Sequence, residues 1–148
     1  MAETLGMLCD KLTIIKLKQY HTTDESRSLS LEKQAVQMQE EIDVYISDAI
    51  NGNIPPEKLS FASNKVFKKE GNEVAKVVGH IGEVFYQLAD VNCRLWHEQE
   101  KVYEFETVPA DEKDKVVKQL ALLNLERNHC IDAINNNFIV LLSNKKEQ

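Results

Sequence analysis

Glycine and proline are scarce in this chain: five glycines and three prolines occur among its 148 residues. None of the glycines belongs to a glycine-rich loop of the kind that cradles phosphate groups. No apolar run approaches the roughly 20 residues of a membrane-spanning helix. The first residues also lack the basic start and apolar run of a signal peptide. These absences argue against a phosphate-loop enzyme and predict a protein without membrane insertion.

Basic residues are outnumbered by acidic ones, 18 to 24, which gives a net charge of −6. This balance argues against nucleic-acid binding and against attraction to anionic membranes. The three cysteines, Cys9, Cys93 and Cys130, are far apart and form no C-x-x-C pair. They are typical of small core residues in a reducing compartment. We therefore predict a cytoplasmic protein.

Apolar residues make up 43% of the chain and recur with helical spacing, without any strand pattern or internal repeat. The spacing predicts four long helices, at about residues 4–21, 29–50, 73–106 and 109–146. Short turns between most of these helices favour antiparallel neighbours. The predicted fold is therefore an all-α, up-and-down bundle in a single domain of residues 1–148, with an irregular connection at about residues 52–72.

Glycine and proline punctuate the predicted helices. The Asn-Gly-Asn stretch at 51–53 accepts positive φ at the end of the second helix, and Pro55-Pro56 prevents its continuation. Residues 56–58 favour a short helix, and the irregular stretch that follows is long enough to cover or line something. Gly79 and Gly82 fall inside the predicted third helix, where they favour close packing.

Arg127 occupies a position where the fourth helix should carry an apolar side chain. The apolar stripe of that helix consists of Val116, Leu120, Leu123, Ile131, Ile134, Phe138 and Leu141. At about 100° per residue, Arg127 falls in the middle of this stripe. A charge in a core is costly unless it is paired or serves a function. We therefore expect Arg127 to be largely buried and bonded to a side chain of another helix.

Further polar residues lie in or beside the apolar arcs of the predicted helices. Antiparallel packing of the third and fourth helices sets residues 92–96 level with residues 124–128. The first helix carries Lys11 and Lys18 on one face. The candidates for a polar inter-helix site are Lys11, Lys18, Asn92, Trp96, Glu98, Gln99, Asn124, Arg127, Asn128 and Asn135.

This set of residues has two interpretations that the sequence leaves open. One is a pocket for a small anionic or sugar-like ligand, because Arg suits carboxylate or phosphate and Asn suits sugar and amide groups. The other is a buried structural network, in which Arg127 pairs with Glu98 or another acid at the edge of the core. Trp96 also fits simple packing on the flank of the bundle.

A metal site is a further interpretation, and the spacing of the residues argues against it. Glu126 and His129 have the E-x-x-H spacing of carboxylate-bridged di-iron bundles, but they project away from the stripe that contains Arg127. The other candidate pair, His97 and Glu100, runs in the reverse order. We expect no metal and no cofactor.

Three segments together resemble a group of small bacterial helical proteins of unknown function, often associated with glycosyltransferases in surface-polysaccharide gene clusters. The segments match D-K-L-T-I-x-x-x-K at residues 10–18, N-x-x-L-W at 92–96 and N-x-x-R-x-x-x-I-x-x-x-N at 124–135. His97 stands where that group has an acid. The resemblance implies a link to surface-polysaccharide synthesis and a glycosyltransferase partner. It also implies that one unit contains Asp10, Lys11, Lys18, Asn92, Trp96, Arg127 and Asn135.

Residues 126–142 also resemble the opening helix of the all-helical chorismate mutases, in which an Arg binds a carboxylate within a bundle. In that family the helix comes first, whereas here it comes last. We favour a non-catalytic binding or accessory protein. One alternative is an enzyme acting on a small anionic substrate, with Arg127 and a lysine as an anion clamp. Another is a scaffold that presents Phe61 and Phe67 to a protein partner.

The first helix is apolar on more sides than one bundle contact requires. Its main stripe is formed by Leu5, Leu8, Leu12 and Ile15, and the apolar residues outside it are Met7, Ile14 and Leu17. Because a large exposed apolar patch usually marks an interface, the sequence predicts a homodimer formed partly through this helix.

Overall fold

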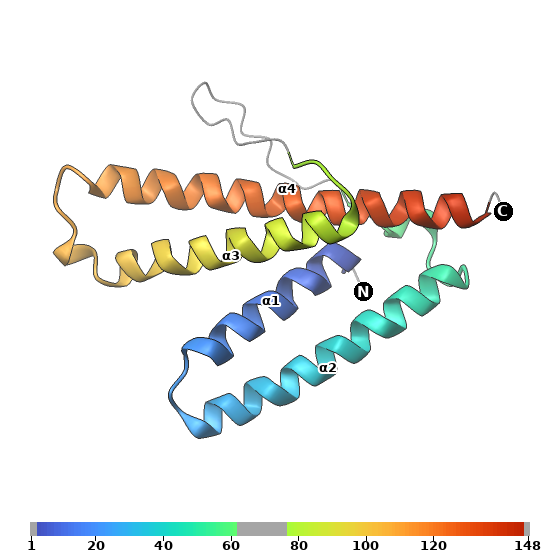
Figure 1. Ribbon diagram of the computed structural model, residues 1–148, viewed down its shortest axis with the longest axis horizontal. Helices are drawn as coiled ribbons and strands as arrows, with labels where there is room; N and C mark the ends of the chain where they lie inside the picture. Colours follow the sequence, from blue (N-terminus) through green and yellow to red (C-terminus); the bar gives the residue numbers. More distant parts are fainter. Residues whose placement is uncertain (1–2, 62–76, 147–148) are drawn as a thin grey trace.

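The computed structural model describes residues 3–61 and 77–146. These residues form four α-helices: α1 (Leu5–His21), α2 (Glu25–Ile50), α3 (Ile81–Tyr103) and α4 (Lys113–Lys146). Two short 3₁₀ turns, η1 (Pro56–Lys58) and η2 (Phe105–Thr107), lie between helices. Within these ranges no strand is present, and the predicted all-α bundle of four helices is confirmed (Figure 1).

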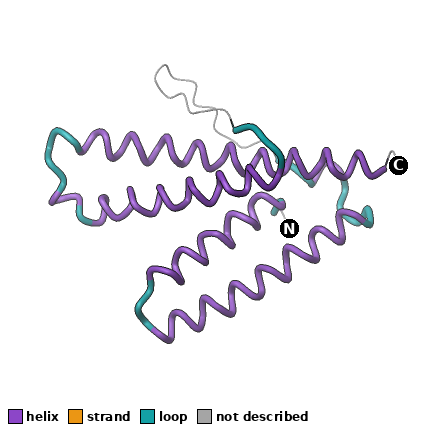
Figure 2. The backbone as a smooth tube through the Cα atoms, in the orientation of Figure 1, coloured by secondary structure: helices purple, strands orange, loops and turns teal. Residues whose placement is uncertain are grey.

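The helices are arranged as two antiparallel pairs. α3 and α4 run side by side, and α1 packs against both of them (Figure 1). α2 lies on the outer side of α1 and diverges from the α3–α4 pair towards its N-terminal end (Figure 2). The C-terminal part of α2 also reaches α4, where the rings of Tyr45 and Phe138 lie 6.2 Å apart. α1 is therefore the central helix of the fold.

Capping side chains fix the starts of α1 and α2. The Thr4 hydroxyl accepts a hydrogen bond from the Met7 amide at 3.4 Å, and the Asp24 carboxylate accepts one from the Arg27 amide at 3.2 Å. Each cap satisfies an amide that the first helical turn leaves unpaired. The predicted start of the second helix at residue 29 is wrong, because the cap at Asp24 begins that helix at Glu25.

α3 begins later than the sequence predicted. The expected start at residue 73 lies outside the described residues, and residues 77–80 are not helical. Gly79 has a φ of 126°, a backbone conformation that no right-handed helix contains. Gly82 lies in the first turn of α3 with open space around it. The predicted role of both glycines in close helix packing is therefore wrong.

The connection between α3 and α4 is longer than predicted. α3 ends at Tyr103 instead of residue 106, and α4 begins at Lys113 instead of near residue 109. The turn η2 occupies part of this connection. A start near Pro109 was expected because proline is favoured in the first turn of a helix. In the structure this local preference does not determine where α4 begins.

The start of the irregular connection after α2 matches the prediction in two details. Gly52 has a φ of 76°, so it ends α2 in the left-handed conformation that glycine favours, and residues 56–58 form the short helix η1. Phe61 is 39% exposed. From residue 62 to residue 72 the connection, including Phe67, lies outside the described residues.

The core lies where α1, α3 and α4 meet. Its fully buried side chains include Val84, Leu88, Val91, Leu123, Cys130 and Ile134. α2 contributes only Leu31 and Ala49 to the buried residues. Leu141, which was expected in the stripe of α4, is 53% exposed, because α4 extends past the end of the α3 pairing (Figure 1).

The extra apolar residues of α1, Met7, Ile14 and Leu17, are each partly buried. The homodimer that they suggested stays a prediction. None of the helices in residues 3–61 and 77–146 combines the length and the apolar character that crossing a membrane requires.

Candidate functional site

The ion pair between Arg127 and Asp10 is the centre of the polar site. The Arg127 Nε donates a hydrogen bond to Asp10 Oδ1 at 2.9 Å, and its Nη2 donates to Asp10 Oδ2. This two-pronged geometry is the strongest that a guanidinium and a carboxylate form. Asp10 is buried on α1, whereas 32% of the Arg127 side chain is exposed. Arg127 is thus bonded to another helix, as expected, but only half-buried.

Asn92 extends this ion pair to α3. Its Nδ2 donates hydrogen bonds to Asp10 Oδ1 at 2.9 Å and to the Thr13 hydroxyl at 2.7 Å. Thr13 in turn donates to the backbone carbonyl of Asp10 at 2.7 Å. We call Asp10, Thr13, Asn92 and Arg127 the polar cluster. It joins α1, α3 and α4 at one point of the core, where the low local dielectric makes each hydrogen bond stronger than it would be in water.

One acceptor of the polar cluster has no partner among the described residues. Asn92 is 1% exposed, and its Oδ1 makes no hydrogen bond in this part of the chain. A buried acceptor without a partner costs free energy. By contrast, the amide nitrogen of Asn92 and both carboxylate oxygens of Asp10 each have at least one partner.

Asn135 forms a second polar contact between α1 and α4. Its Oδ1 accepts a hydrogen bond from the Gly6 amide at 2.8 Å, and its side chain is buried. The Gly6 amide belongs to the first turn of α1 and has no partner within the helix. A side chain on Gly6 would meet Asn135 Oδ1 at 3.0 Å and the Ile131 carbonyl oxygen at a shorter distance. Glycine at this position therefore permits the close approach of the two helices.

Charge and burial shift the pKa values around the polar cluster. The hydrogen bond to the Asp10 carboxylate raises the pKa of Arg127 above its usual range. Burial, with a smaller contribution from Asp10, raises the pKa of the Cys9 thiol to about 11. The pKa of the Cys130 thiol also rises to about 11, mainly through burial and then through Glu126. Both thiols are therefore protonated and unreactive at neutral pH.

The other predicted site residues lie away from the polar cluster. The expected partner of Arg127 was Glu98 or another acid: Glu98 instead accepts a hydrogen bond from Lys101 at 2.9 Å, and Asp10 is the acid that pairs with Arg127. Lys11 pairs with Glu3 on the surface. The remaining exposed members of the predicted set are Lys18, Gln99, Asn124 and Asn128. The structure brings together only Asn92 and Arg127 with Asp10, and places Asn135 in the separate contact with Gly6.

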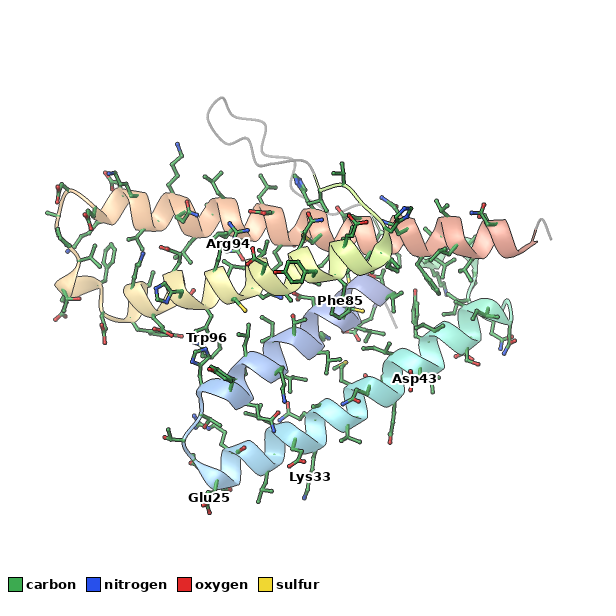
Figure 3. The ribbon with its side chains drawn as sticks, viewed as in Figure 1. Glu25, Lys33, Asp43, Phe85, Arg94 and Trp96 are labelled. Atoms are coloured by element: carbon green, nitrogen blue, oxygen red, sulfur yellow. The ribbon has the colours of Figure 1, made fainter. Side chains whose placement is uncertain are left out.

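Trp96 lies beside the C-terminal end of α1 (Figure 3). Its ring is stacked on His21 with 4.7 Å between the ring centroids, and His21 meets Tyr20 edge to face at 5.3 Å. Two of these rings, those of Tyr20 and His21, line a groove of about 420 Å³ between α1 and α3. We call it the α1–α3 groove, and it is lined by Thr13, Lys16, Leu17, Tyr20, His21, Ala89 and Cys93. Thr13 connects it directly to the polar cluster.

Thr13 was not selected from the sequence, and Asp10 was grouped with the site only through the family resemblance, although the helical spacing contains a signal for both. Gly6, Asp10 and Thr13 are spaced four and three apart, which places them on one face of α1. That face differs from the stripe that begins with Leu5 and Leu8. Small and polar residues at helical spacing on a helix that is apolar elsewhere indicate a second packing face. This face is the one that meets α3 and α4.

Residues with metal-binding side chains do not gather in the described part of the chain, where no group of three His, Cys, Asp or Glu could hold an ion. Comparison of the chain with protein-family models, with curated proteins and with solved structures found no match. The resemblance to the glycosyltransferase-associated proteins therefore stays a prediction.

Proposed function

We propose that this chain is a cytoplasmic, non-catalytic binding protein that holds a small anionic or sugar-like ligand in the α1–α3 groove. The observation that carries the proposal is the pairing of Arg127 with Asp10. Because Asp10 already neutralises Arg127, this arginine is not free to act as an anion clamp. We therefore assign the proposed ligand site to the adjoining groove and not to the centre of the bundle.

The chemistry of the α1–α3 groove suits an anion attached to a flat or apolar body. Residues 11–23 contain three lysines and no acid, and Lys16 lines the groove directly. Leu17, Ala89 and Cys93 supply an apolar wall. Tyr20 and His21 line the groove and supply aromatic faces, on which a sugar ring or an aromatic ring packs. A volume of about 420 Å³ is in the range of small-molecule sites.

An enzyme with a chorismate-mutase-like clamp is less well supported. Such an enzyme needs a free cation for the substrate and a poised acid or base within reach. Asp10 uses both of its oxygens on Arg127 and Asn92, and Glu98 is engaged by Lys101. An accessory role beside a glycosyltransferase in surface-polysaccharide synthesis agrees with a binding protein, and it rests on the sequence resemblance alone.

Trp96 is the only tryptophan of the chain, and its ring is stacked on His21, which lines the groove, so its fluorescence reports on ligand contact with His21. The purified protein is titrated with UDP-glucose, as a sugar nucleotide, and with phenylpyruvate, as an aromatic carboxylate. We expect a saturable change of Trp96 emission with at least one of them. Lys16→Gln should weaken that binding about tenfold, which is the loss of roughly one charge-assisted contact.

Lys33→Gln is the matched control, because Lys33 is an exposed lysine on α2 and its replacement changes the net charge equally. It should leave the affinity unchanged. The proposal fails if neither compound changes the emission in a saturable way, or if the two lysine variants weaken binding to the same extent.

A further inference from the structure

A second groove lies on the opposite side of α1, between its first turns, α2 and the segment that follows α2. Its volume is about 610 Å³, which is far more than a single inorganic cation needs. The apolar side chains that line it are Leu8, Val44, Tyr45, Ile54 and Pro55. We call this the acidic groove, because its remaining lining is dominated by carboxylates.

Three carboxylates of the acidic groove have no cationic partner within residues 3–61 and 77–146. They belong to Glu40, Glu41 and Asp48, all on α2. A fourth, Glu3, is already paired with Lys11. Lys58 is the one basic residue that lines the groove. α2 contains four acids and no Lys or Arg over residues 34–50, so this face has an excess of negative charge.

The negative charge and the apolar floor of the acidic groove together indicate the chemistry of the partner that fits it. Glu41 and Asp48 are seven residues apart on one face of α2, which is about 10 Å along the helix. An amphipathic helix presents basic side chains at the same two-turn spacing, with apolar side chains between them. Val44 lies between the two acids and is 59% exposed, so it offers the apolar contact that such a helix requires.

We propose that the acidic groove docks a basic amphipathic helix of a partner protein. The carboxylates of Glu40, Glu41 and Asp48 face its lysines or arginines, and the floor around Val44 and Tyr45 receives its apolar side chains. This is the helix-in-groove mode of recognition, with charge complementarity setting the choice of partner. A second copy of this chain does not fit through its own α2, since that helix carries the same negative charge.

The test uses a fluorescently labelled peptide of about 15 residues, or roughly four helical turns. It carries lysine on one face and leucine on the other, and its binding to the full chain is followed by fluorescence anisotropy. The variant Glu40→Gln/Glu41→Gln/Asp48→Asn should bind it at least about tenfold more weakly, because three charge contacts are removed. The control Glu100→Gln/Glu104→Gln/Glu106→Gln changes the net charge equally near the far end of α3 and should bind like the wild type.

A second variant tests the apolar floor. Val44→Ser changes an exposed side chain, so the fold should survive, and binding should weaken while the charge stays the same. Equal weakening by both triple variants would mean general attraction between opposite charges and would overturn the proposal. Displacement of the peptide by an equimolar amount of 1,4-diaminobutane would also overturn it, because the groove would then be a site for small cations.

Discussion

At the scale of single residues, Asp10 determines what the polar cluster does. Its carboxylate is buried, and it accepts hydrogen bonds from Arg127 and Asn92, which belong to two different helices. An unpaired carboxylate at this depth would cost several kcal/mol. The pairing therefore accounts for an arginine in the apolar stripe of α4 without any ligand.

The two buried thiols next to the polar cluster predict how stability depends on pH. Their pKa values are about 11 in the folded chain, against an ordinary value of 9.0 that applies in the unfolded chain. Between pH 9 and 11 the unfolded state therefore binds fewer protons, and the free energy of unfolding falls as the pH rises. Each thiol contributes up to about 2 kcal/mol to this loss.

Urea unfolding under reducing conditions at pH 8.5 and pH 10.5 measures this loss of stability. Cys130→Ala should lose less stability between these two pH values than the wild type does. Cys93→Ala, at an exposed position, is the control and should behave like the wild type. Identical losses for all three proteins would contradict the assignment of the alkaline instability to Cys130.

At the scale of helices, the start of α1 and α4 approach each other closely at Gly6. Gly6→Ala would push a methyl group into the Ile131 carbonyl and Asn135, so we expect it to destabilise the chain by about 1–3 kcal/mol. Gly82→Ala is the matched control, because nothing lies near that position in α3. It should stabilise the chain by about 0.5–1 kcal/mol through the better helix propensity of alanine.

Thermal and urea unfolding of both alanine variants decides this prediction. Two variants of equal stability would show that α1 and α4 do not approach as closely as the structure places them. The hydrogen bond from the Gly6 amide to Asn135 Oδ1, which depends on this close approach, would then also be in doubt.

The sequence predicted the helices better than it predicted their ends. Apolar spacing found all four helices because each buries a stripe along its length. The ends depend on single contacts, such as the cap at Asp24, which starts α2 four residues earlier than expected. The positive φ of Gly79 likewise excludes it from a helix whose apolar pattern continues through it. Periodicity alone contains neither piece of information.

The candidate site was predicted in part, for a related reason. Arg127, Asn92 and Asn135 interrupt or border apolar stripes, and all three meet α1 in the structure. Asn124 and Asn128 lie on the edge of the same stripe and are exposed, because α4 buries a narrower arc than the wheel suggested. Helical spacing did not identify Asp10 as the acid that pairs with Arg127, because α1 has two packing faces and only the one with Leu5 and Leu8 is strongly apolar. The family resemblance alone grouped Asp10 with Arg127.

At the scale of the whole molecule, the polar cluster holds together helices from both halves of the chain. α1 comes from the first half, and α3 and α4 come from the second. The two grooves on either side of α1 differ in charge: Lys16 lines one, and the other is lined by carboxylates that have no cationic partner in the described part of the chain. We infer that Asp10 and Arg127 hold these two halves together as a structural ion pair, and that the binding proposed above uses the grooves and not Arg127.

A double-mutant cycle on the free energy of unfolding tests this claim most directly, using the wild type, Asp10→Asn, Arg127→Met and the double variant. Arg127→Met should cost about 3 kcal/mol, since it leaves the buried Asp10 carboxylate without its cation. Asp10→Asn should cost only about 1–2 kcal/mol, because Arg127 still reaches water. The double variant should be more stable than the sum of the two losses predicts, by at least about 1 kcal/mol. A neutral or stabilising Arg127→Met with no coupling to Asp10 would contradict the account and return Arg127 to the role of a ligand clamp.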